Sequence, residues 1–407
     1  MSETQTRPAP ALAGIRIADF SHFIAGPFAS TILSDMGAEV IKIEKIDGGD
    51  DFRRLGPAVT PQEGAPYVWT NRNKRGIALD LRKPEGQAIA REIIAKSDIV
   101  LENFSAGVMK RFGLDYDSLS KDHPRLIYCA VSAYGRSGPL ADRLGFDPIT
   151  QAEAGFMALN GEPGGFGTRA GPSIMDMSTA MMAANAMLGA LFARERTGRG
   201  QYLECALFDQ AVTMVGFHAT NYMVSGKEPP RFGNNSRDTV PTAAFETADR
   251  PIYIACANDR TWHRLADQVL GHPEWATDPE YATTPARIRN RDRLLDMVQA
   301  VLRTRTRADW LEPMRKAGVP AGAINTVAEA FDGEDIAARG LVTHIPHPAA
   351  GTVPNVALSF RMFGTPLVDP VAAPMLGQHS VPILRDLLGY DAERIEALVD
   401  SQVVGRQ

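Results

Sequence analysis

The first 150 residues alternate two apolar patterns, and this alternation constrains the fold more than any other feature of the sequence. Residues 14–20 and 38–44 are short apolar runs typical of strands, and residues 27–36 between them have the pattern of a helix. A strand, a helix and a second strand form the unit from which parallel sheets are built. The alternation continues through residues 76–81, a helical segment at 85–96 opened by Pro84, and residues 98–103 and 126–131. The sequence therefore predicts an α/β fold with a doubly wound parallel sheet.

A doubly wound sheet binds its ligands beyond the carboxyl ends of its strands. This rule places the loop 21–27, Lys45, Asn103-Phe104 and the loop 132–138 near one crevice. The dinucleotide-binding pattern GxGxxG does not occur in this region of the sequence. A nicotinamide-dependent dehydrogenase would therefore lack its phosphate loop.

Basic residues gather near the predicted strand ends of the same region. They are Lys45, Arg53, Arg54, Lys74, Arg75, Arg82 and Arg111. Arginine and lysine bind phosphate groups well, so the cluster favours a phosphorylated cofactor. The alternative, that each of them is a solvated surface charge, stays open at this point.

Asp176 is a lone carboxylate immediately before seventeen uncharged residues, 177–193. The run is rich in Ala, Met and Leu and predicts a largely buried helix, with Asp176 in its first turn. Free backbone N–H groups and the helix dipole favour an ionised carboxylate at that end. An ionised carboxylate can attack an activated carbonyl, which makes Asp176 a candidate nucleophile. The structural alternative is an ordinary helix cap, because aspartate is common at that position.

Composition and charge narrow the class of protein. A chain of 407 residues with 44% hydrophobic and 22% charged residues is typical of a soluble globular protein of two domains. A net charge of -5 argues against nucleic acid or a membrane surface as a partner, because polyanions require a positive field. The polar residues 1–8 lack the apolar segment of a signal peptide, which indicates the cytoplasm. The uncharged run at 177–193 is slightly short for a membrane span.

The three cysteines, Cys129, Cys205 and Cys256, lie far apart in apolar surroundings and without CxxC spacing. We expect them to be reduced core residues. No HxxxH or Cys/His spacing indicates a metal site, so no bound metal is expected.

The composition changes after the first part of the chain. Residues 226–240 are rich in Pro, Gly and Asn, which is typical of a linker. This change predicts a large domain at 1–225, a linker at 226–240, a small domain at 241–330, and a linker with a C-terminal segment at 331–407.

Several motifs stand in an order and at spacings that are specific when taken together. They are residues 12–20 and 37–44, Asn73-Lys74-Arg75, Glu102-Asn103-Phe104, residues 107–113, Thr197-Gly198-Arg199-Gly200-Gln201 and Pro374-Met375-Leu376-Gly377-Gln378-His379. With these motifs the chain resembles class III CoA-transferases over nearly its whole length.

In the CoA-transferases that this chain resembles, the nucleophile is an aspartate just before the long helix, and Asp176 stands there. The resemblance implies that Asp176 attacks a donor thioester to give a mixed anhydride and free CoA thiolate, which then forms an aspartyl-CoA thioester. The acceptor acid repeats these steps in reverse while water is excluded. Acyl-CoA and a free carboxylic acid are then substrates, and no cofactor is permanently bound.

The resemblance also implies a CoA site, with cations on the phosphates and Phe104 against the adenine or pantetheine. Its residues would be Ile24, Ala25, Lys45, Leu79, Arg82, Asn103, Phe104, Arg111 and Gly145. The implied fold is a large Rossmann-like domain with a smaller α+β domain. It forms an interlocked homodimer in which the C-terminal segment returns to the large domain.

An alternative within the same superfamily is an α-methylacyl-CoA racemase, which moves a proton next to the thioester. Such racemases usually have a histidine in a Gly-His-Asp element, whereas this chain has Gly145-Phe146-Asp147. His22 and His218 stay open as substitutes. A CoA-binding module without catalysis is a third hypothesis, which a buried and salt-bridged Asp176 would favour.

Two departures from the family pattern bear on the substrate. Thr179-Ala180 stands where many relatives have Thr-Gly, and the glycine-rich loop of oxalate-specific members is not recognisable in this sequence. A formyl or oxalyl substrate is therefore disfavoured. Members with this simpler small domain often act on succinyl-CoA and on dicarboxylic or hydroxy acids, and the donor and acceptor stay open.

Overall fold

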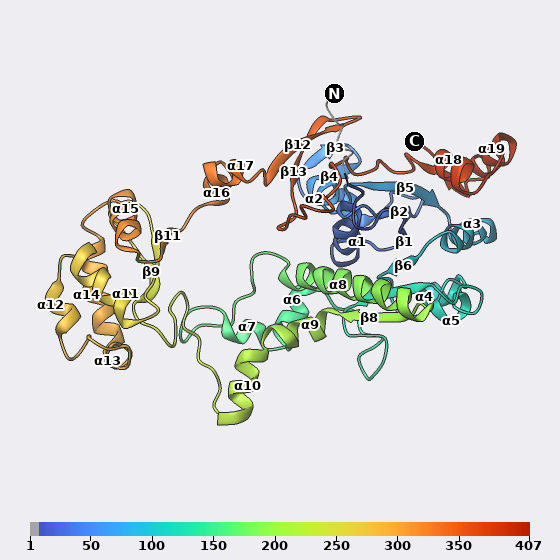
Figure 1. Cartoon of the computed structure of the whole chain (residues 1–407). Coiled ribbons are helices and arrows are strands. Elements are labelled where there is room, and N and C mark those ends of the chain that lie inside the picture. The colour runs from blue at the N-terminus through green and yellow to red at the C-terminus, as the bar shows by residue number, and fades with distance from the viewer. Residues whose placement is uncertain (1–7) are drawn as a thin grey trace. The chain divides into compact units, whose positions relative to one another are not determined.

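Figure 1 shows the structure, a computed structural model that describes residues 8–407. The expectation of a cytoplasmic location rests on residues 1–8. Of these, residues 1–7 lie outside the described part of the chain. The chain divides into two compact units. The first unit comprises the chain up to Phe156, Ala170–Phe217 and Ala337–Gln407, and the second comprises Met157–Arg169 and His218–Ile336. The domain limits expected from composition stay a prediction, and they place residues 157–169 differently from this division.

The first unit contains a large sheet with strand order β14-β5-β2-β1-β6-β7-β8. Its strands are β1 (Arg16–Asp19), β2 (Glu39–Glu44), β5 (Lys74–Leu79), β6 (Ile99–Glu102), β7 (Ile127–Ser132), β8 (Tyr202–Ala206) and β14 (Val404–Gly405). All neighbouring pairs are parallel except β14 with β5. This arrangement confirms the mixed α/β class and the parallel sheet.

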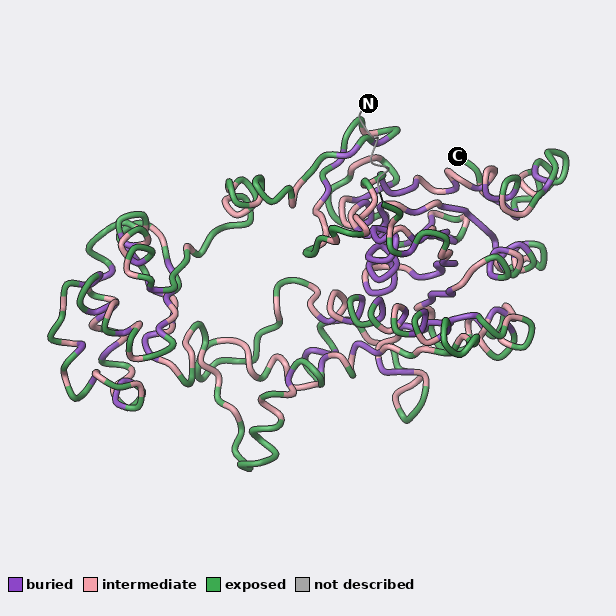
Figure 2. Tube along the Cα trace, in the orientation of Figure 1, coloured by how far each residue is buried: buried purple, intermediate pink, exposed green. Residues whose placement is uncertain are grey.

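Alternate residues of these strands enter two hydrophobic cores. On β1, Ile17 belongs to one core and Ala18 to the other. The same alternation holds for Ile99 and Val100 on β6. Because successive strand side chains point to opposite faces, both faces of the sheet are buried, as near-continuous apolar strands require. Figure 2 shows most of this sheet as buried segments, whereas the edge strand β8 is only partly buried.

Two helices cover the face of the sheet that carries Ile17. They are α1 (Ala25–Asp35) and α8 (Ile174–Thr197), which pack against each other. α8 is the one helix of the described chain with the length and apolar character of a membrane span. Ala180, Ala183, Ala184, Met187 and Ala190 instead pack in the core against the sheet, whereas Met181 and Met182 are exposed. α3 (Pro84–Ala95) contributes to the core on the opposite face.

The remaining elements of the first unit are short. They are η1 (Asp51–Arg54), β3 (Ala58–Thr60), β4 (Glu63–Gly64), α2 (Ala65–Thr70), α4 (Val108–Arg111), α5 (Tyr116–Leu119), α6 (Asp147–Glu153), α9 (Leu207–Met214), β12 (Val342–His347), β13 (Gly351–Val356), α18 (Ser380–Pro382), η3 (Ile383–Leu387) and α19 (Ala392–Asp400). The chain passes from one unit to the other within α7 (Phe156–Leu159), between Arg169 and Ala170, and within α10 (Gly216–Ser225) and α17 (Glu334–Ala338).

The second unit has its own sheet and core. Its antiparallel strands are β9 (Thr242–Phe245), β10 (Ile252–Ala255) and β11 (Ala321–Ala323). Its helices are α11 (Asp259–Arg264), η2 (Leu265–Val269), α12 (Pro273–Thr277), α13 (Thr284–Arg289), α14 (Arg291–Leu302), α15 (Arg307–Ala317) and α16 (Val327–Phe331). Trp262 and Trp310 are buried at the centre of this core.

The cysteines are unpaired, as expected from their spacing. Cys129 and Cys256 are buried and Cys205 is half-buried. Within residues 8–407, no group of three or more His, Cys, Asp or Glu side chains is placed to hold a metal ion.

Candidate functional site

The strand order reverses between β1 and β6, the two central strands of the large sheet. The loops after such a pair leave in opposite directions and open a crevice at the carboxyl ends of the strands. Here Asn103, in the loop after β6, joins the two loops through hydrogen bonds to the backbone of His22, in the loop after β1. Its Oδ1 accepts the backbone N–H of His22 at 2.9 Å, and its Nδ2 donates to the His22 carbonyl at 2.8 Å.

A cavity of about 340 Å³ lies beyond the ends of β1, β2, β5 and β6. Its lining residues are Phe20, Ser21, His22, Ile43, Glu44, Lys45, Ile46, Asp47, Gly49, Asp50, Asp51, Leu79, Asp80, Leu81, Arg82, Phe104, Val108 and Phe112. The wall is mainly apolar with charged groups among the lining residues, which is typical of a site for a small organic molecule. Ser21, His22, Lys45 and Phe104 line this cavity, as the predicted crevice requires, whereas Asn103 and the loop 132–138, which were expected at the same crevice, do not.

Four of the nine residues expected at the CoA site line this cavity, namely Lys45, Leu79, Arg82 and Phe104. The other five are Ile24, Ala25, Asn103, Arg111 and Gly145, none of which lines it. Ile24 and Ala25 lie at the start of α1, Asn103 fastens the loop of His22, and Arg111 is exposed at the end of α4. Gly145 packs against Tyr134, because a Cβ there would lie 2.7 Å from the tyrosine ring.

Both cations of the cavity are exposed and already paired. Lys45 lies 2.8 Å from Asp51, and Arg82 lies 2.8 Å from Asp80 and 3.4 Å from Asp47. Exposed ion pairs of this kind contribute little to stability. Lys45 and Arg82 can therefore exchange these partners for the phosphates of a ligand.

Two other strand-end cations, Arg53 and Lys74, serve the fold, so the phosphate role expected for them is wrong. Arg53 is buried and bonds to Glu44 at 2.7 Å, to Glu63 at 3.3 Å and to the Pro374 carbonyl at 3.0 Å. Lys74 is fully buried and lies 3.1 Å from Asp19. Burial lowers the pKa of Lys74 to about 8 in spite of Asp19.

Asp19 belongs to the same buried network at the end of β1. Burial alone would raise its pKa, but Lys74, Lys42 and two serine hydroxyls together lower the pKa of Asp19 to about 2. The network therefore keeps a carboxylate ionised directly beneath the cavity. Burial lowers the pKa of the neighbouring His22, so its imidazole is neutral at pH 7.

Asp176 lies in the first turn of α8, as its place before the uncharged run predicts. The backbone N–H groups there are not free. Oδ2 of Asp147, at the start of α6, accepts the N–H of Met175 at 2.6 Å and that of Asp176 at 3.2 Å. Asp147 itself is buried, and its Oδ1 accepts a hydrogen bond from Gln151 at 2.5 Å.

This arrangement changes the ionisation expected for Asp176. Burial, and then the charge of Asp147, raise the pKa of Asp176 from its ordinary value of 3.8 to about 7. The expectation that the helix start favours the ionised form of this carboxylate is therefore wrong, because burial and the charge of Asp147 raise its pKa. No donor among residues 8–407 bonds to the Asp176 carboxylate, and no cation there pairs with it. Carboxylates with such raised pKa values are typical of catalytic sites.

Ring contacts connect the cavity to the region of Asp176. The ring centroids of Phe104 and His22 lie 5.4 Å apart, those of His22 and Phe23 5.3 Å, and those of Phe23 and Phe146 6.3 Å. Phe146 directly precedes Asp147. The series therefore runs from the cavity wall to the residue that caps α8.

The sequence did not indicate a role for Phe146 and Asp147 in this site, and it placed Phe23 there only as part of the loop 21–27. The element Gly145-Phe146-Asp147 was considered only for its missing histidine. Its aspartate was the available signal, since aspartate is favoured at helix starts.

Comparison with known proteins gives a consistent result. The sequence profile of CoA-transferase family III matches residues 12–380. The succinyl-CoA:glutarate CoA-transferase of Mus musculus is 35% identical over 395 residues, with 97% of this chain and 90% of the relative covered. The succinate–glutarate CoA-transferase of Agrobacterium fabrum is 36% identical, with 93% and 96% covered.

One further relative concerns the acceptor acid. The acetyl-CoA:oxalate CoA-transferase of Acetobacter aceti is 38% identical over 340 residues, with 83% of this chain and 87% of the relative covered. Among solved structures, a CAIB/BAIF family protein from Brucella suis has a TM-score of 0.85 at 35% identity, with 93% of this chain and all of that chain covered.

Proposed function

The chain belongs to CoA-transferase family III, and we propose that it transfers CoA from an acyl-CoA donor to a free carboxylic acid through covalent intermediates on Asp176. The observation that carries this proposal is the Asp176 carboxylate. It is half-buried at the start of α8, receives no hydrogen bond within residues 8–407, and has a pKa raised to about 7. A carboxylate without partners keeps its electron pairs for attack on a carbonyl.

The proposed reaction has two symmetric halves. An oxygen of Asp176 attacks the thioester carbonyl carbon of the donor, the carbon–sulfur bond breaks, and CoA leaves as the thiolate. The thiolate then attacks the Asp176 carbonyl carbon of the mixed anhydride, releases the donor acid as its carboxylate, and leaves an aspartyl-CoA thioester. The acceptor carboxylate attacks this thioester, and the same two steps in reverse give the new acyl-CoA and free Asp176.

Within this proposal the cavity beyond β1, β2, β5 and β6 holds CoA. Lys45 and Arg82 would bind its phosphates, and Phe104 would pack against its adenine or pantetheine. Ile24, Ala25, Asn103, Arg111 and Gly145 complete the proposed site as the family resemblance implies. The strand order, with its reversal between β1 and β6, supports the Rossmann-like assignment of the large domain.

We propose succinyl-CoA as the donor and a dicarboxylate such as glutarate as the acceptor, because one relative above is named for succinyl-CoA and glutarate and another for succinate and glutarate. The relative named for oxalate keeps oxalate among the acids that need to be assayed, although the sequence disfavours it. A cytoplasmic interlocked homodimer, with the domain limits given above, belongs to the same proposal.

The two alternative functions are less well supported. A racemase needs a proton-transfer histidine, and Phe146 stands where that residue is usual. A CoA-binding module without catalysis would be favoured by a salt-bridged Asp176, but within residues 8–407 no cation pairs with this carboxylate.

The proposal is tested by incubating the protein with succinyl-CoA and glutarate, and with acetyl-CoA and oxalate, in deuterated water. Mass spectrometry should detect the new acyl-CoA without deuterium at its α carbon. Asp209, an exposed aspartate in the first turn of α9, provides a matched control for Asp176. Asp176→Ala should abolish transfer, whereas Asp209→Ala should retain it. Deuterium incorporation without exchange of acids would contradict the proposal.

A further inference from the structure

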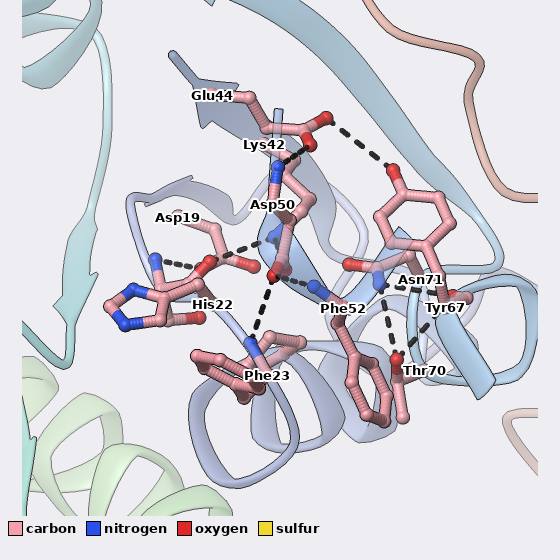
Figure 3. Close-up of polar contacts among 12 residues, drawn as sticks. Asp19, His22, Phe23, Lys42, Glu44, Asp50, Phe52, Tyr67, Thr70 and Asn71 are labelled. Atoms are coloured by element: carbon pink, nitrogen blue, oxygen red, sulfur yellow. Dashed lines mark hydrogen bonds and ion pairs between the residues drawn. The ribbon is translucent and has the colours of Figure 1, made fainter. Parts of the chain in front are cut away.

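Side chains fix the backbone of the turn Ser21–Phe23 at every residue. The Ser21 N–H donates to Asp19 Oδ1 at 2.9 Å, and the Ser21 carbonyl accepts from Lys42 Nζ at 2.7 Å. His22 exchanges two hydrogen bonds with Asn103. The Phe23 N–H donates to Asp50 Oδ1 at 3.1 Å. Figure 3 shows Asp19, Lys42 and Asp50 gathered around this turn.

Phe23 has an unusual backbone conformation for its residue type. Its φ is +63°, in the left-handed region that favours glycine. A bulky residue keeps such a conformation only where the surroundings over-determine it, and such residues cluster at active sites and ligand clamps. At this turn the surroundings are the Asp50 carboxylate and the bonds at Ser21 and His22.

Asp50 links three segments through one carboxylate. It accepts the N–H of Phe23 at 3.1 Å and that of Phe52 at 3.0 Å, and it pairs with Lys42 Nζ at 3.1 Å. The side chains of Lys42 and Asp50 are 0% and 1% exposed. A buried ion pair is a poor source of stability, because desolvation offsets its attraction. A role in fixing one backbone conformation of the turn explains the buried Lys42–Asp50 pair better.

The ring of Phe23 occupies a central place in the site. It contacts His22, which lines the cavity, and Phe146, which precedes Asp147. It also contacts Phe52, whose N–H is bound by Asp50. Asp50 therefore holds both the backbone of Phe23 and one of its packing partners.

We propose that Asp50, with its ion-pair partner Lys42, is a positioning residue for the transfer reaction. It holds Phe23 in the left-handed conformation, and so keeps the Phe23 ring between the cavity and the start of α8 that carries Asp176. This inference rests on the proposed function. Asp50 takes no part in bond making, and its effect passes through Phe23.

A double-mutant cycle tests this dependence. Asp50→Ala and Phe23→Ala should each lower kcat for CoA transfer by about 10- to 100-fold, since small misplacements of reacting groups have effects of that size. If Asp50 acts through Phe23, the double variant should be no slower than the slower single variant within about twofold. Multiplicative losses in the double variant, or an unchanged kcat in Asp50→Ala, would overturn the inference.

The control is another buried carboxylate of the first unit. Asp35 pairs with Arg72 at 2.6 Å, and its side chain is 8% exposed. Asp35→Asn disturbs a buried ion pair of similar kind and should leave kcat per folded molecule unchanged. Should Asp50→Ala not fold, Asp50→Asn keeps one acceptor oxygen and should give a smaller loss of kcat with the same non-additivity. If Asp35→Asn lost as much kcat as Asp50→Ala, the effect of Asp50 would be a general structural one.

A crystal structure of Asp50→Ala separates this inference from the proposed function. Phe23 should leave the left-handed region there, whether or not the enzyme transfers CoA. If the wild-type protein transfers CoA to no acid, the proposed function fails. The φ of Phe23 in Asp50→Ala still tests the positioning role in that case. A Phe23 φ still near its wild-type value in Asp50→Ala would overturn the positioning role alone.

Discussion

Oδ2 of Asp147 accepts the backbone N–H of Asp176 at 3.2 Å, so two carboxylates meet at the start of α8. Asp147 satisfies two N–H groups of the helix start with one oxygen, Oδ2, and its charge at the same time repels the charge of Asp176. The result is a carboxylate whose ionisation changes near neutral pH rather than near pH 4.

Asp147→Asn should shift the pH dependence of CoA transfer. Attack requires ionised Asp176, so wild-type activity should rise with pH through about 7. Without the charge of Asp147 the pKa of Asp176 falls, and the acid limb of the kcat profile should move about 0.5–1 pH unit lower. Steady-state rates between pH 5 and 9 measure this. Asp292→Asn, at an exposed residue of the second unit, is the control and should leave the pH profile unchanged. If the acid limb of the profile did not shift in Asp147→Asn, Asp147 would not set the ionisation of Asp176.

Asp176→Asn should stabilise the protein at alkaline pH. Because the folded-state pKa of Asp176 is raised to about 7, the unfolded chain ionises first, and the free energy of unfolding falls as pH rises from about 4 to beyond 7. The amide in Asp176→Asn does not ionise, so the variant does not lose this stability. Urea unfolding should show no advantage of the variant near pH 3.5 and an advantage of about 2–4 kcal/mol near pH 9. If the free energy of unfolding varied with pH in the same way in both proteins, ionisation of Asp176 would not destabilise the fold.

Lys45→Ala and Arg82→Ala should weaken CoA binding while leaving the chemical step nearly intact. Each removes a cation from the cavity, so KM for succinyl-CoA should rise about 5- to 50-fold with a kcat within about threefold of wild type. The thermal midpoint should change little, because both cations are exposed in their pairs with Asp51 and Asp80. Raising the salt concentration should weaken wild-type binding more than that of either variant. A loss confined to kcat would exclude the phosphate role.

Arg53→Met should destabilise the first unit strongly. The change leaves the buried carboxylates of Glu44 and Glu63 without their cation and should cost about 3–5 kcal/mol in urea unfolding. Arg385→Met breaks an exposed pair with Asp386 and serves as the control, with no measurable change expected. A small effect at Arg53 would mean that water reaches this network.

Much of the fold was predictable because both faces of the sheet are buried. The near-continuous apolar runs at 14–20, 38–44 and 98–103 correspond to β1, β2 and β6 within two residues at each end. The helix after Asp176 was predictable because alanine and methionine favour helix and no charge interrupts the run until Arg194.

The electrostatics of the site were not predictable, because they depend on contacts between distant segments. Nothing local to Asp176 reveals that a carboxylate 29 residues earlier in the chain caps its helix. Arg53 and Lys74 looked like phosphate ligands because the sequence shows their charge and not their burial. The left-handed Phe23 is likewise held by Asp50, 27 residues further along the chain.

Chemical trapping shows whether Asp176 carries the transferred group covalently. Wild-type enzyme is incubated with succinyl-CoA, treated with hydroxylamine or borohydride, digested, and analysed by peptide mass spectrometry. The account predicts a hydroxamate or a reduced side chain at Asp176, formed only when succinyl-CoA is present. Modification of a different carboxylate, or steady CoA transfer with Asp176 never modified, would contradict it.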